Sequence, residues 1–335
     1  MRRLKFAAAV LPVCLTMLSG PAIAEQVRVA HFFAQDSVIA ETDQGFADEL
    51  AEKTDLELEI FWAGAMGGGK EILALVSGGA VQMGATVPSY YPSELPVASV
   101  GSSPLFYYAN PQQALEVTRT IVSDDPAGKA EMERLGIEPL VIHTAAPYRL
   151  VCNKPVEKVA DMDGLKIRTF SAISTKAMSA VGAVPVSMGS GEVYEALQRG
   201  TIDCAMYNNE FSVARKLHEV AKYWSTVSFG AISGTQLFAN KAFMDSLPED
   251  VAETVRAAGR QAEEAELEKV LAADKEAAEI AKEAGVTFVE FKEQAQLEEA
   301  MPDTLELWVK EITGKGVAQE DADRLAGVVR KITGN

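Results

Sequence analysis

Two arginines in the middle of the chain have the residue type and the setting needed to bind a carboxylate. Arg149 lies in the run Y-R-L-V and Arg168 in L-K-I-R-T-F, and both runs are short, apolar and rich in β-forming residues. Each guanidinium is therefore expected to project from a strand rather than from the exposed face of a helix. A guanidinium donates two parallel hydrogen bonds to the two oxygens of a carboxylate, so an arginine at a cleft is suited to grip an organic acid.

A repeated β-α-β rhythm is expected to position these arginines. Strands are predicted at 26–32, 56–62, 81–85, 138–143, 149–153, 165–170, 184–187 and 201–207, and helices at 37–53, 70–76, 111–122, 126–135, 172–181 and 191–199. The rhythm occurs once before the arginines and once around them, which indicates two α/β domains. In such domains helices cover a largely parallel sheet, and ligand groups lie at the carboxyl ends of its strands.

The last third of the chain is dominated by helix formers. From Pro248 to Ala284 the sequence predicts one helix of about 50 Å, which is longer than one domain needs and should lie across both. A strand at 233–240 returns the chain to the first domain before this helix. A strand at 286–291 and helices at about 294–312 and 318–332 are expected to complete the second.

Four segments together resemble one family. R-L-V-C-N-K-P-V, D-G-L-K-I-R-T-F and E-V-Y-E-A-L-Q-R-G-T-I-D follow one another around the arginines, and F-W-A-G-A-M-G-G-G-K-E-I-L-A-L-V-S-G-G-A-V-Q-M-G spans 61–84. In order and spacing they are similar to the DctP-type solute-binding proteins of tripartite ATP-independent periplasmic (TRAP) transporters. The resemblance runs through essentially the whole mature chain.

The resemblance implies a type II-like periplasmic binding protein, with a cleft between two lobes and a long helix spanning both. Lobe I is expected to comprise 25–146 and 235–270, and lobe II 147–234 and 271–335. The family's ligand-gripping arginine corresponds to Arg168. Arg149 corresponds to a second basic position often near the ligand, with an ion pair between the domains as its alternative role.

Further candidate ligand contacts surround these arginines. They are Tyr207 and Asn208 at the end of the last strand of the second unit, His31, Phe32 and Ser37 at the end of the first strand, Glu71 after the glycine run, and Trp224. Core packing or helix capping is the alternative for each of the first-domain residues, and core packing for Trp224. Residues 64–70 also fit the G-x-x-x-x-G-K frame of a phosphate-binding loop, but Glu71 replaces the Ser or Thr that would hold magnesium.

The N-terminus predicts export. Arg2, Arg3 and Lys5 precede an apolar run, and Ala22-Ile23-Ala24 is typical of a signal-peptide cleavage site, so residues 1–24 should be removed and the mature protein should be periplasmic. The mature chain then carries 28 basic against 48 acidic residues, a net charge of −20. This charge disfavours nucleic acid and anionic membrane surfaces as partners, so an anionic ligand must be attracted by arginines inside the cleft. No later segment is long and apolar enough for membrane insertion.

Nothing in the sequence points to catalysis. The three histidines show no metal-ligand spacing, no nucleophile motif is present, and no cofactor or metal is expected. Cys152 and Cys204 remain after cleavage, either as two small buried residues or as a disulfide.

The favoured hypothesis is therefore a binding protein that captures a small organic anion by hinge closure and delivers it to the small and large membrane subunits of a TRAP transporter. The alternatives are a ligand sensor that feeds a signalling receptor and, less favoured, a periplasmic hydrolase or isomerase.

Overall fold

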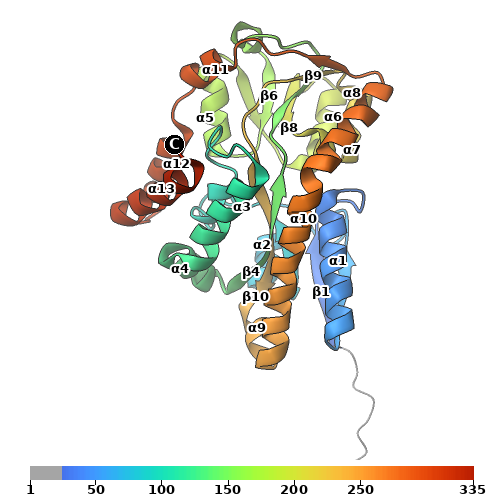
Figure 1. The fold of residues 1–335 in the computed structure, drawn as a ribbon, viewed down its shortest axis with the longest axis vertical. Helices are drawn as coiled ribbons and strands as arrows, with labels where there is room; N and C mark the ends of the chain where they lie inside the picture. Colours follow the sequence, from blue (N-terminus) through green and yellow to red (C-terminus); the bar gives the residue numbers. More distant parts are fainter. Residues whose placement is uncertain (1–24) are drawn as a thin grey trace, which may run out of the picture.

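The computed structural model describes residues 25–335. The predicted leader 1–24 and its cleavage near Ala24 lie outside the described residues. The chain forms two lobes, each built on one mixed sheet with helices around it (Figure 1). The predicted two-lobed α/β architecture is confirmed.

The first lobe contains a five-stranded sheet in the order β2-β1-β3-β10-β4. Its strands are β1 (Glu25–His31), β2 (Leu56–Phe61), β3 (Met83–Thr86), β4 (Ile137–Ala145) and β10 (Ile232–Asn240). β1 pairs in parallel with β2 and β3, whereas β10 is antiparallel to both of its neighbours. β10 returns from the second lobe to this sheet, as the sequence predicts, and it lies between β3 and β4.

The second lobe contains a six-stranded sheet in the order β11-β9-β5-β8-β6-β7. Its strands are β5 (Arg149–Cys152), β6 (Lys166–Thr169), β7 (Val184–Ser187), β8 (Cys204–Tyr207), β9 (Tyr223–Ser225) and β11 (Thr287–Val289). β8 lies between β5 and β6, so the strands that carry the two candidate arginines flank it. A disulfide joins Cys152 to Cys204 directly across β5 and β8, so the alternative of two unpaired cysteines is wrong.

Most predicted helices are present with small shifts of their ends. The helices are α1 (Val38–Lys53), α2 (Ile72–Ser77), α3 (Pro111–Arg119), α4 (Pro126–Leu135), α5 (Ala172–Ala180), α6 (Val193–Gln198), α7 (Asn209–Ala214), α8 (Leu217–Val220), α9 (Lys241–Ser246), α10 (Glu249–Glu283), α11 (Gln294–Ala300), α12 (Thr304–Gly314) and α13 (Gln319–Thr333). Short helical turns are η1 (Pro88–Tyr90), η2 (Ala98–Gly101), η3 (Thr120–Asp124), η4 (Val159–Met162) and η5 (Ser190–Glu192). No helix among residues 25–335 combines the length and the apolar character that a membrane span requires.

The 35-residue helix α10 connects the two lobes. It packs against α1 and β4 in the first lobe and against α7 in the second, and it runs past both in Figure 1. Its contact with β4 is close because Gly259 has no side chain: a Cβ there would lie 2.2 Å from the Leu140 carbonyl oxygen. The prediction of a long helix lying across both lobes is confirmed.

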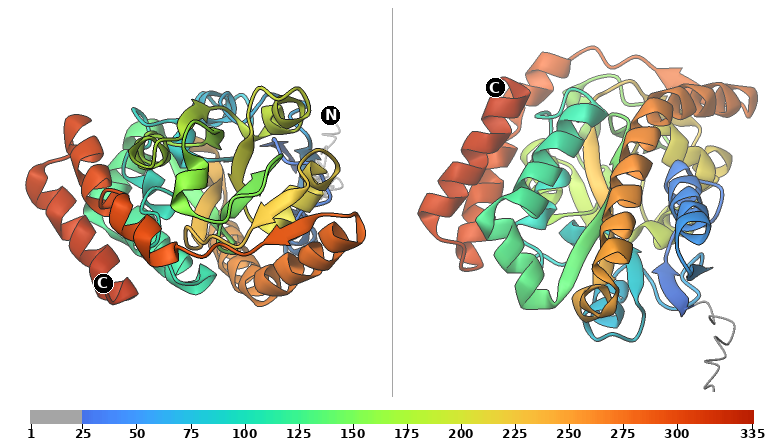
Figure 2. Two further views of the ribbon diagram at one scale, coloured as in Figure 1. Left: turned by 90° about the horizontal axis from the view of Figure 1, so that it is seen from above. Right: turned by 60° about the horizontal axis from the view of Figure 1, so that its bottom comes forward.

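The C-terminal segment differs in detail from its prediction. The single helix expected at 294–312 is two helices, because Pro302 interrupts the pattern and Asp303 caps the new start by accepting hydrogen bonds from the Leu305 and Glu306 amides. α12 and α13 lie beside α3 (Figure 2), and α12 also contacts α5. The lobe boundaries given above stay a prediction.

Candidate functional site

A small cavity lies between the two sheets, with walls from both lobes. Its volume is about 30 Å³. Six aromatic side chains line it, namely Phe33, Tyr90, Tyr148, Phe170, Tyr207 and Phe211. The polar side chains around it include those of His143, Thr144, Arg168, Ser190, Arg215 and Thr235. The cavity is therefore an aromatic chamber with basic groups in its wall.

Arg168 is a fully buried cation of this wall. It lies on β6 and is 2% exposed, yet it forms no ion pair with any of residues 25–335. Its guanidinium donates long hydrogen bonds to the Met188 carbonyl at 3.3 Å, the Met206 carbonyl at 3.4 Å and the Tyr90 hydroxyl at 3.3 Å. These neutral acceptors leave its positive charge without a counter-ion.

The ring of Tyr207 supports Arg168 from one side. The Arg168 guanidinium carbon lies 4.7 Å from the centroid of this ring and 5.4 Å from that of Phe170. Such cation–π contacts orient a guanidinium without using its N–H donors. The Tyr207 hydroxyl is itself buried, with the Ser190 side chain as its polar neighbour. Both groups are therefore available to a molecule in the cavity.

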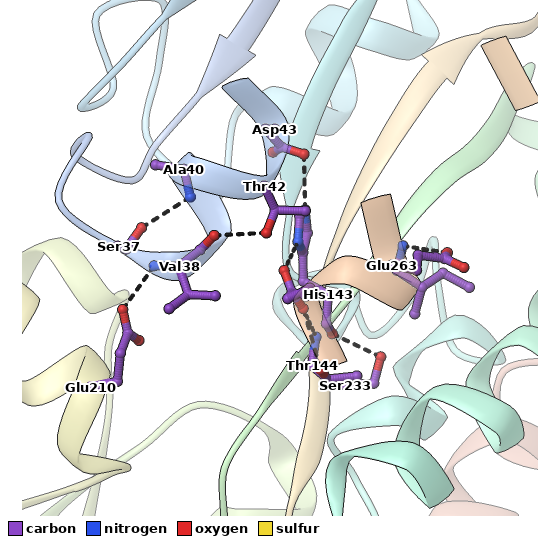
Figure 3. Close-up of polar contacts among 12 residues, drawn as sticks. Ser37, Val38, Ala40, Thr42, Asp43, His143, Thr144, Glu210, Ser233 and Glu263 are labelled. Carbon is purple, nitrogen blue, oxygen red and sulfur yellow. Dashed lines mark hydrogen bonds and ion pairs between the residues drawn. The ribbon is translucent and has the colours of Figure 1, made fainter. Parts of the chain in front are cut away.

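Several contacts join the two lobes around the cavity. The hydroxyl of Tyr90, in η1 of the first lobe, accepts hydrogen bonds from Arg168 and from the Ser190 amide at 3.2 Å. The carboxylate of Glu210, on α7, accepts a hydrogen bond of 2.9 Å from the Val38 amide in the first turn of α1 (Figure 3). Burial raises the pKa of Glu210 to about 7, against the effect of this hydrogen bond. The two lobes are thus in direct polar contact at two places.

A buried chain of charged groups lies behind the cavity, inside the first lobe. Nε2 of His31 is 2.9 Å from Oδ2 of Asp43, whose Oδ1 is 3.2 Å from Nε2 of His143. Nδ1 of His143 is in turn 2.7 Å from the Glu266 carboxylate on α10. Figure 3 shows Asp43 of α1 and His143 of β4 facing each other.

The opposite charges of these four buried residues compensate one another. Burial alone would lower the pKa of His143, but Asp43 and Glu266 outweigh it and raise that pKa to about 10. Burial likewise opposes ionisation of Asp43, yet the two histidines hold its pKa well below the usual range. His143 is therefore an imidazolium at neutral pH, fixed between two carboxylates and already paired within the protein.

Three buried carboxylates of α10 attach this helix to the lobes. Glu263 accepts from the Ile142 amide and pairs with Arg119, and Glu266 accepts from the Thr144 amide. Asp274 accepts from the amides of Asn209 and Glu210 at the start of α7, at 2.7 and 3.1 Å. The first two therefore hold β4, and the third holds the second lobe.

Arg149 belongs to this attachment rather than to the cavity wall. Its Nη2 lies 3.8 Å from Oδ2 of Asp274, and burial lowers its pKa. The pair joins β5 of the second lobe to the long helix α10, and the alternative role of an ion pair between the domains stays a prediction. Its contact with a ligand stays a prediction.

The remaining candidate residues lie outside the cavity wall, with the exception of Tyr207. Ser37 caps α1 by accepting from the Ala40 amide, and Asn208 caps α7 by accepting from the Phe211 amide. Glu71 accepts from the Gly68 amide and closes the glycine-rich turn. Phe32 packs against Phe33 and Tyr90, while Trp224 is 0% exposed and donates to the Ala221 carbonyl. His31 belongs to the buried charged chain, and ligand contact by these residues stays untested.

The sequence interpretation missed most of the aromatic wall. Tyr148 begins the run around Arg149 and Phe170 ends the run around Arg168, so the position of both in the sequence is a usable signal. Tyr90 comes from a proline- and serine-rich stretch without periodicity, and Arg215 follows a short helix that was not predicted. Residues 25–335 contain no cluster of three or more side chains that could hold a metal ion.

Comparisons with known proteins agree with this architecture. Residues 29–312 match the model of the bacterial extracellular solute-binding proteins, family 7. The chain is 32% identical over 243 residues to the C4-dicarboxylate-binding periplasmic protein DctP of Rhodobacter capsulatus, covering 70% of this chain and 71% of that one. It is 27% identical to the 2,3-diketo-L-gulonate-binding periplasmic protein YiaO of Escherichia coli, covering 80% and 82%.

A solved structure with a similar fold is an extracytoplasmic solute receptor of Bordetella pertussis that binds pyroglutamic acid. It superimposes with a TM-score of 0.81 at 22% identity, covering 92% of this chain and 100% of that one. This likeness extends over both lobes and over the helix that connects them.

Proposed function

The chain belongs to the bacterial extracellular solute-binding proteins of family 7, and from this premise we propose that it captures a small organic acid by its carboxylate in the cavity around Arg168. The resemblance to the DctP-type TRAP binding proteins is confirmed by this match and by the 32% identical relative. The relatives described above are named for C4-dicarboxylate, diketogulonate and pyroglutamate, each of which is an organic acid.

The observation that carries the proposal is the buried, unpaired charge of Arg168. Removing an ion from water costs several kcal/mol, and an opposite charge with good geometry offsets that cost. Within residues 25–335 the guanidinium meets only neutral acceptors at 3.3 to 3.4 Å. A ligand carboxylate would replace these weak contacts with two charge-assisted hydrogen bonds.

Hinge closure is the proposed mechanism of capture. Arg168 belongs to the second lobe and Tyr90 to the first, and their side chains are already in contact. A carboxylate held by Arg168 can also accept from the Tyr90 hydroxyl, so the ligand would contact both lobes in the closed form alone. The ligand therefore stabilises the closed form by as much as its binding free energy to that form exceeds its binding free energy to the open form. The cavity of about 30 Å³ holds little more than one or two waters, so the lobes must part to admit an acid.

The finer parts of the function follow from family membership. We propose that the mature protein works in the periplasm and passes its acid to the small and large membrane subunits of a TRAP transporter. The names of the family and of its relatives describe binding proteins, which supports a binding role over a hydrolase or isomerase. The similarity to DctP, the type of binding protein that serves TRAP transporters, favours transport over a sensor that feeds a signalling receptor.

A thermal-unfolding screen of residues 25–335 against organic acids, neutral sugars and amino acids tests the proposal. An acid present at about 100 times its dissociation constant should add about 2.7 kcal/mol to the free energy of unfolding. The substitution Arg168→Gln should remove that gain. Arg199→Gln is the matched control, because Arg199 is exposed directly after α6 and its loss changes the net charge equally. Stabilisation by neutral solutes alone, or full acid binding by the Arg168→Gln variant, would refute the proposal.

A further inference from the structure

One carboxylate of the second lobe is covered by the first lobe. Glu210 lies on α7 and is 8% exposed, and its carboxylate accepts a hydrogen bond of 2.9 Å from the Val38 amide at the start of α1 (Figure 3). Ile39, the next residue of α1, is buried in the hydrophobic cluster that also contains Tyr207 and Phe211 of the second lobe. The first turn of α1 therefore packs on the second lobe and covers Glu210.

The groups around Glu210 do not compensate its charge. Glu210 forms no ion pair with any of residues 25–335. The carboxylates of Glu266 and Asp274, both on α10, disfavour a further negative charge at this position. Arg215, at the end of α7, favours that charge, but only from beyond ion-pair distance. The hydrogen bond from the Val38 amide is thus the direct contact that supports the ionised carboxylate, and it comes from the other lobe.

These surroundings change how readily Glu210 binds a proton. In the closed form, burial raises the pKa of Glu210 from an ordinary 4.5 to about 7, and Glu266 and Asp274 add to this rise while the Val38 amide and Arg215 oppose it. Parting of the lobes removes α1 from the carboxylate and returns it to water, where a carboxyl group titrates near its ordinary value. The carboxyl group therefore binds a proton more tightly in the closed form than in the open form.

We infer that Glu210 is a proton-dependent latch between the lobes: closure takes up a proton at this residue, so the protein captures its acid more tightly at acidic than at alkaline pH. The inference rests on the proposed function, because capture is the event that closes the lobes. The gain in affinity is fully present below about pH 4.5, declines as the pH rises, and is lost above about pH 7.

Titration calorimetry on residues 25–335 at two pH values tests the latch. The probes are pyroglutamate, galacturonate and benzoate, three monoacids of different shape whose carboxylates are ionised above about pH 5. An acid that binds should bind about tenfold or more tightly at about pH 5.5 than at about pH 8.5. Titrations in buffers of different ionisation enthalpy should show uptake of about one proton per bound acid at about pH 6, and none at about pH 8.5.

Two matched variants assign this effect to Glu210. Glu210→Gln keeps an acceptor for the Val38 amide but cannot ionise, so its affinity should no longer depend on pH and should exceed that of the wild type at about pH 8.5. The proton uptake should disappear with it. Glu219→Gln removes an exposed carboxylate of the same lobe, on α8, and should keep the pH dependence of the wild type.

Val38→Pro provides a second test, which also applies if Glu210→Gln does not fold. Val38 is the first residue of α1, a position that suits proline, and Ser37 before it already has the extended backbone that proline requires, with φ −125° and ψ 155°. Proline has no N–H, so the ionised carboxylate loses its hydrogen bond. Affinity should therefore fall about tenfold at about pH 8.5 and by less at about pH 5.5.

The possible failures are distinguishable. Equal affinities of the wild type at the two pH values, or an undiminished pH dependence in Glu210→Gln, would overturn the latch while leaving the proposed function in place. An equal loss of affinity at both pH values in Val38→Pro would also overturn it. Failure of all three acids to bind at either pH would overturn both, because no affinity would then be measured at all.

Discussion

Arg149 and Arg168 lie on the two strands that flank β8, yet their surroundings are opposite. Arg149 faces Asp274 of α10 at 3.8 Å and helps to attach the second lobe to the long helix. Arg168 faces the cavity and forms no ion pair among residues 25–335. Residue type and strand setting are the same for both. What separates an attachment residue from a candidate ligand-binding residue is therefore a carboxylate contributed by a distant part of the chain.

The same contrast holds between two neighbouring regions. In the chain of His31, Asp43, His143 and Glu266, each charge meets its opposite inside the protein. In the adjoining cavity, Arg168 meets no opposite charge among residues 25–335. Removing one partner of a buried ion pair destabilises the fold because the other charge is left uncompensated, whereas an unpaired buried charge already carries that cost, which a ligand can offset. This difference can be tested by removing one charge at a time.

The largest expected effect is on binding, in Arg168→Met. Losing one partner of a buried charge pair costs about 2–5 kcal/mol of binding free energy, so affinity for the acid found in the screen should fall at least about thirtyfold. The unfolding free energy without ligand should stay the same or rise, because an uncompensated buried charge is removed. Urea unfolding and calorimetry measure the two effects. A marked loss of stability without ligand would show that Arg168 is paired structurally after all.

His143→Gln should produce the opposite pattern. Breaking a buried ion pair by removing one partner typically costs about 3–5 kcal/mol, and here two carboxylates lose their common cation. Urea unfolding without ligand should show this loss. A cost below about 1 kcal/mol would mean that the buried chain contributes no more than an exposed ion pair.

The pH dependence of stability sharpens the same point. The pKa of His143 is about 10 in the folded protein against an ordinary 6.5, so its contribution is fully present below pH 6.5 and is lost as the pH rises towards 10. The lowered pKa of Asp43 matters at acidic pH. The contribution of Asp43 to the free energy of unfolding is lost as the pH falls below the ordinary pKa of 3.8. The difference in unfolding free energy between the wild type and His143→Gln should therefore shrink between about pH 6 and about pH 10. A difference that does not vary with pH would contradict the ion pairing.

The smallest expected effect is that of Arg149→Met. Its pair with Asp274 is long, and that carboxylate keeps the amide donors of α7, so we expect a stability loss of about 1 kcal/mol. Affinity for the acid should change less than about threefold, because a group outside the cavity wall makes no charge-assisted hydrogen bond to the ligand. Calorimetry on this variant also tests the sequence-based hypothesis that Arg149 contacts the ligand. A loss of binding equal to that in Arg168→Met would remove the contrast between the two arginines.

The fold was largely predictable because its long elements carry clear periodicity. Apolar Leu56, Leu58 and Ile60 alternate with polar residues through β2. After Pro248, α10 consists almost entirely of residues that favour a helix. The elements missed were α7, α8, α9 and β9, each too short for a period to be recognised. Pro302 gave a signal for the break between α11 and α12 that the helix prediction overrode.

The site was less predictable because its walls come from many separate elements. Arg168 and Tyr207 could be named from the sequence and do line the cavity. Tyr90 and Arg215 reach it only through the packing of the two lobes. No local sequence pattern distinguishes an arginine that pairs with a carboxylate from a distant segment from an arginine that has no such partner. Asn208 and Ser37 were proposed as ligand contacts because they are polar. In the structure each side chain instead caps the start of a helix, a role that Asn and Ser commonly have.

The attachments of α10 also define how the lobes are rotated about the helix axis. Glu266 holds the first lobe and Asp274 the second, so only residues 267–273 lie between them, about two turns of helix. Among these seven residues Val270 alone is buried. Each residue turns the helix by about 100°, so one inserted residue would swing the second attachment about a quarter of a circle away from α7. The angular phase between the lobes, and with it the alignment of their cavity walls, is set by the number of residues between two carboxylates.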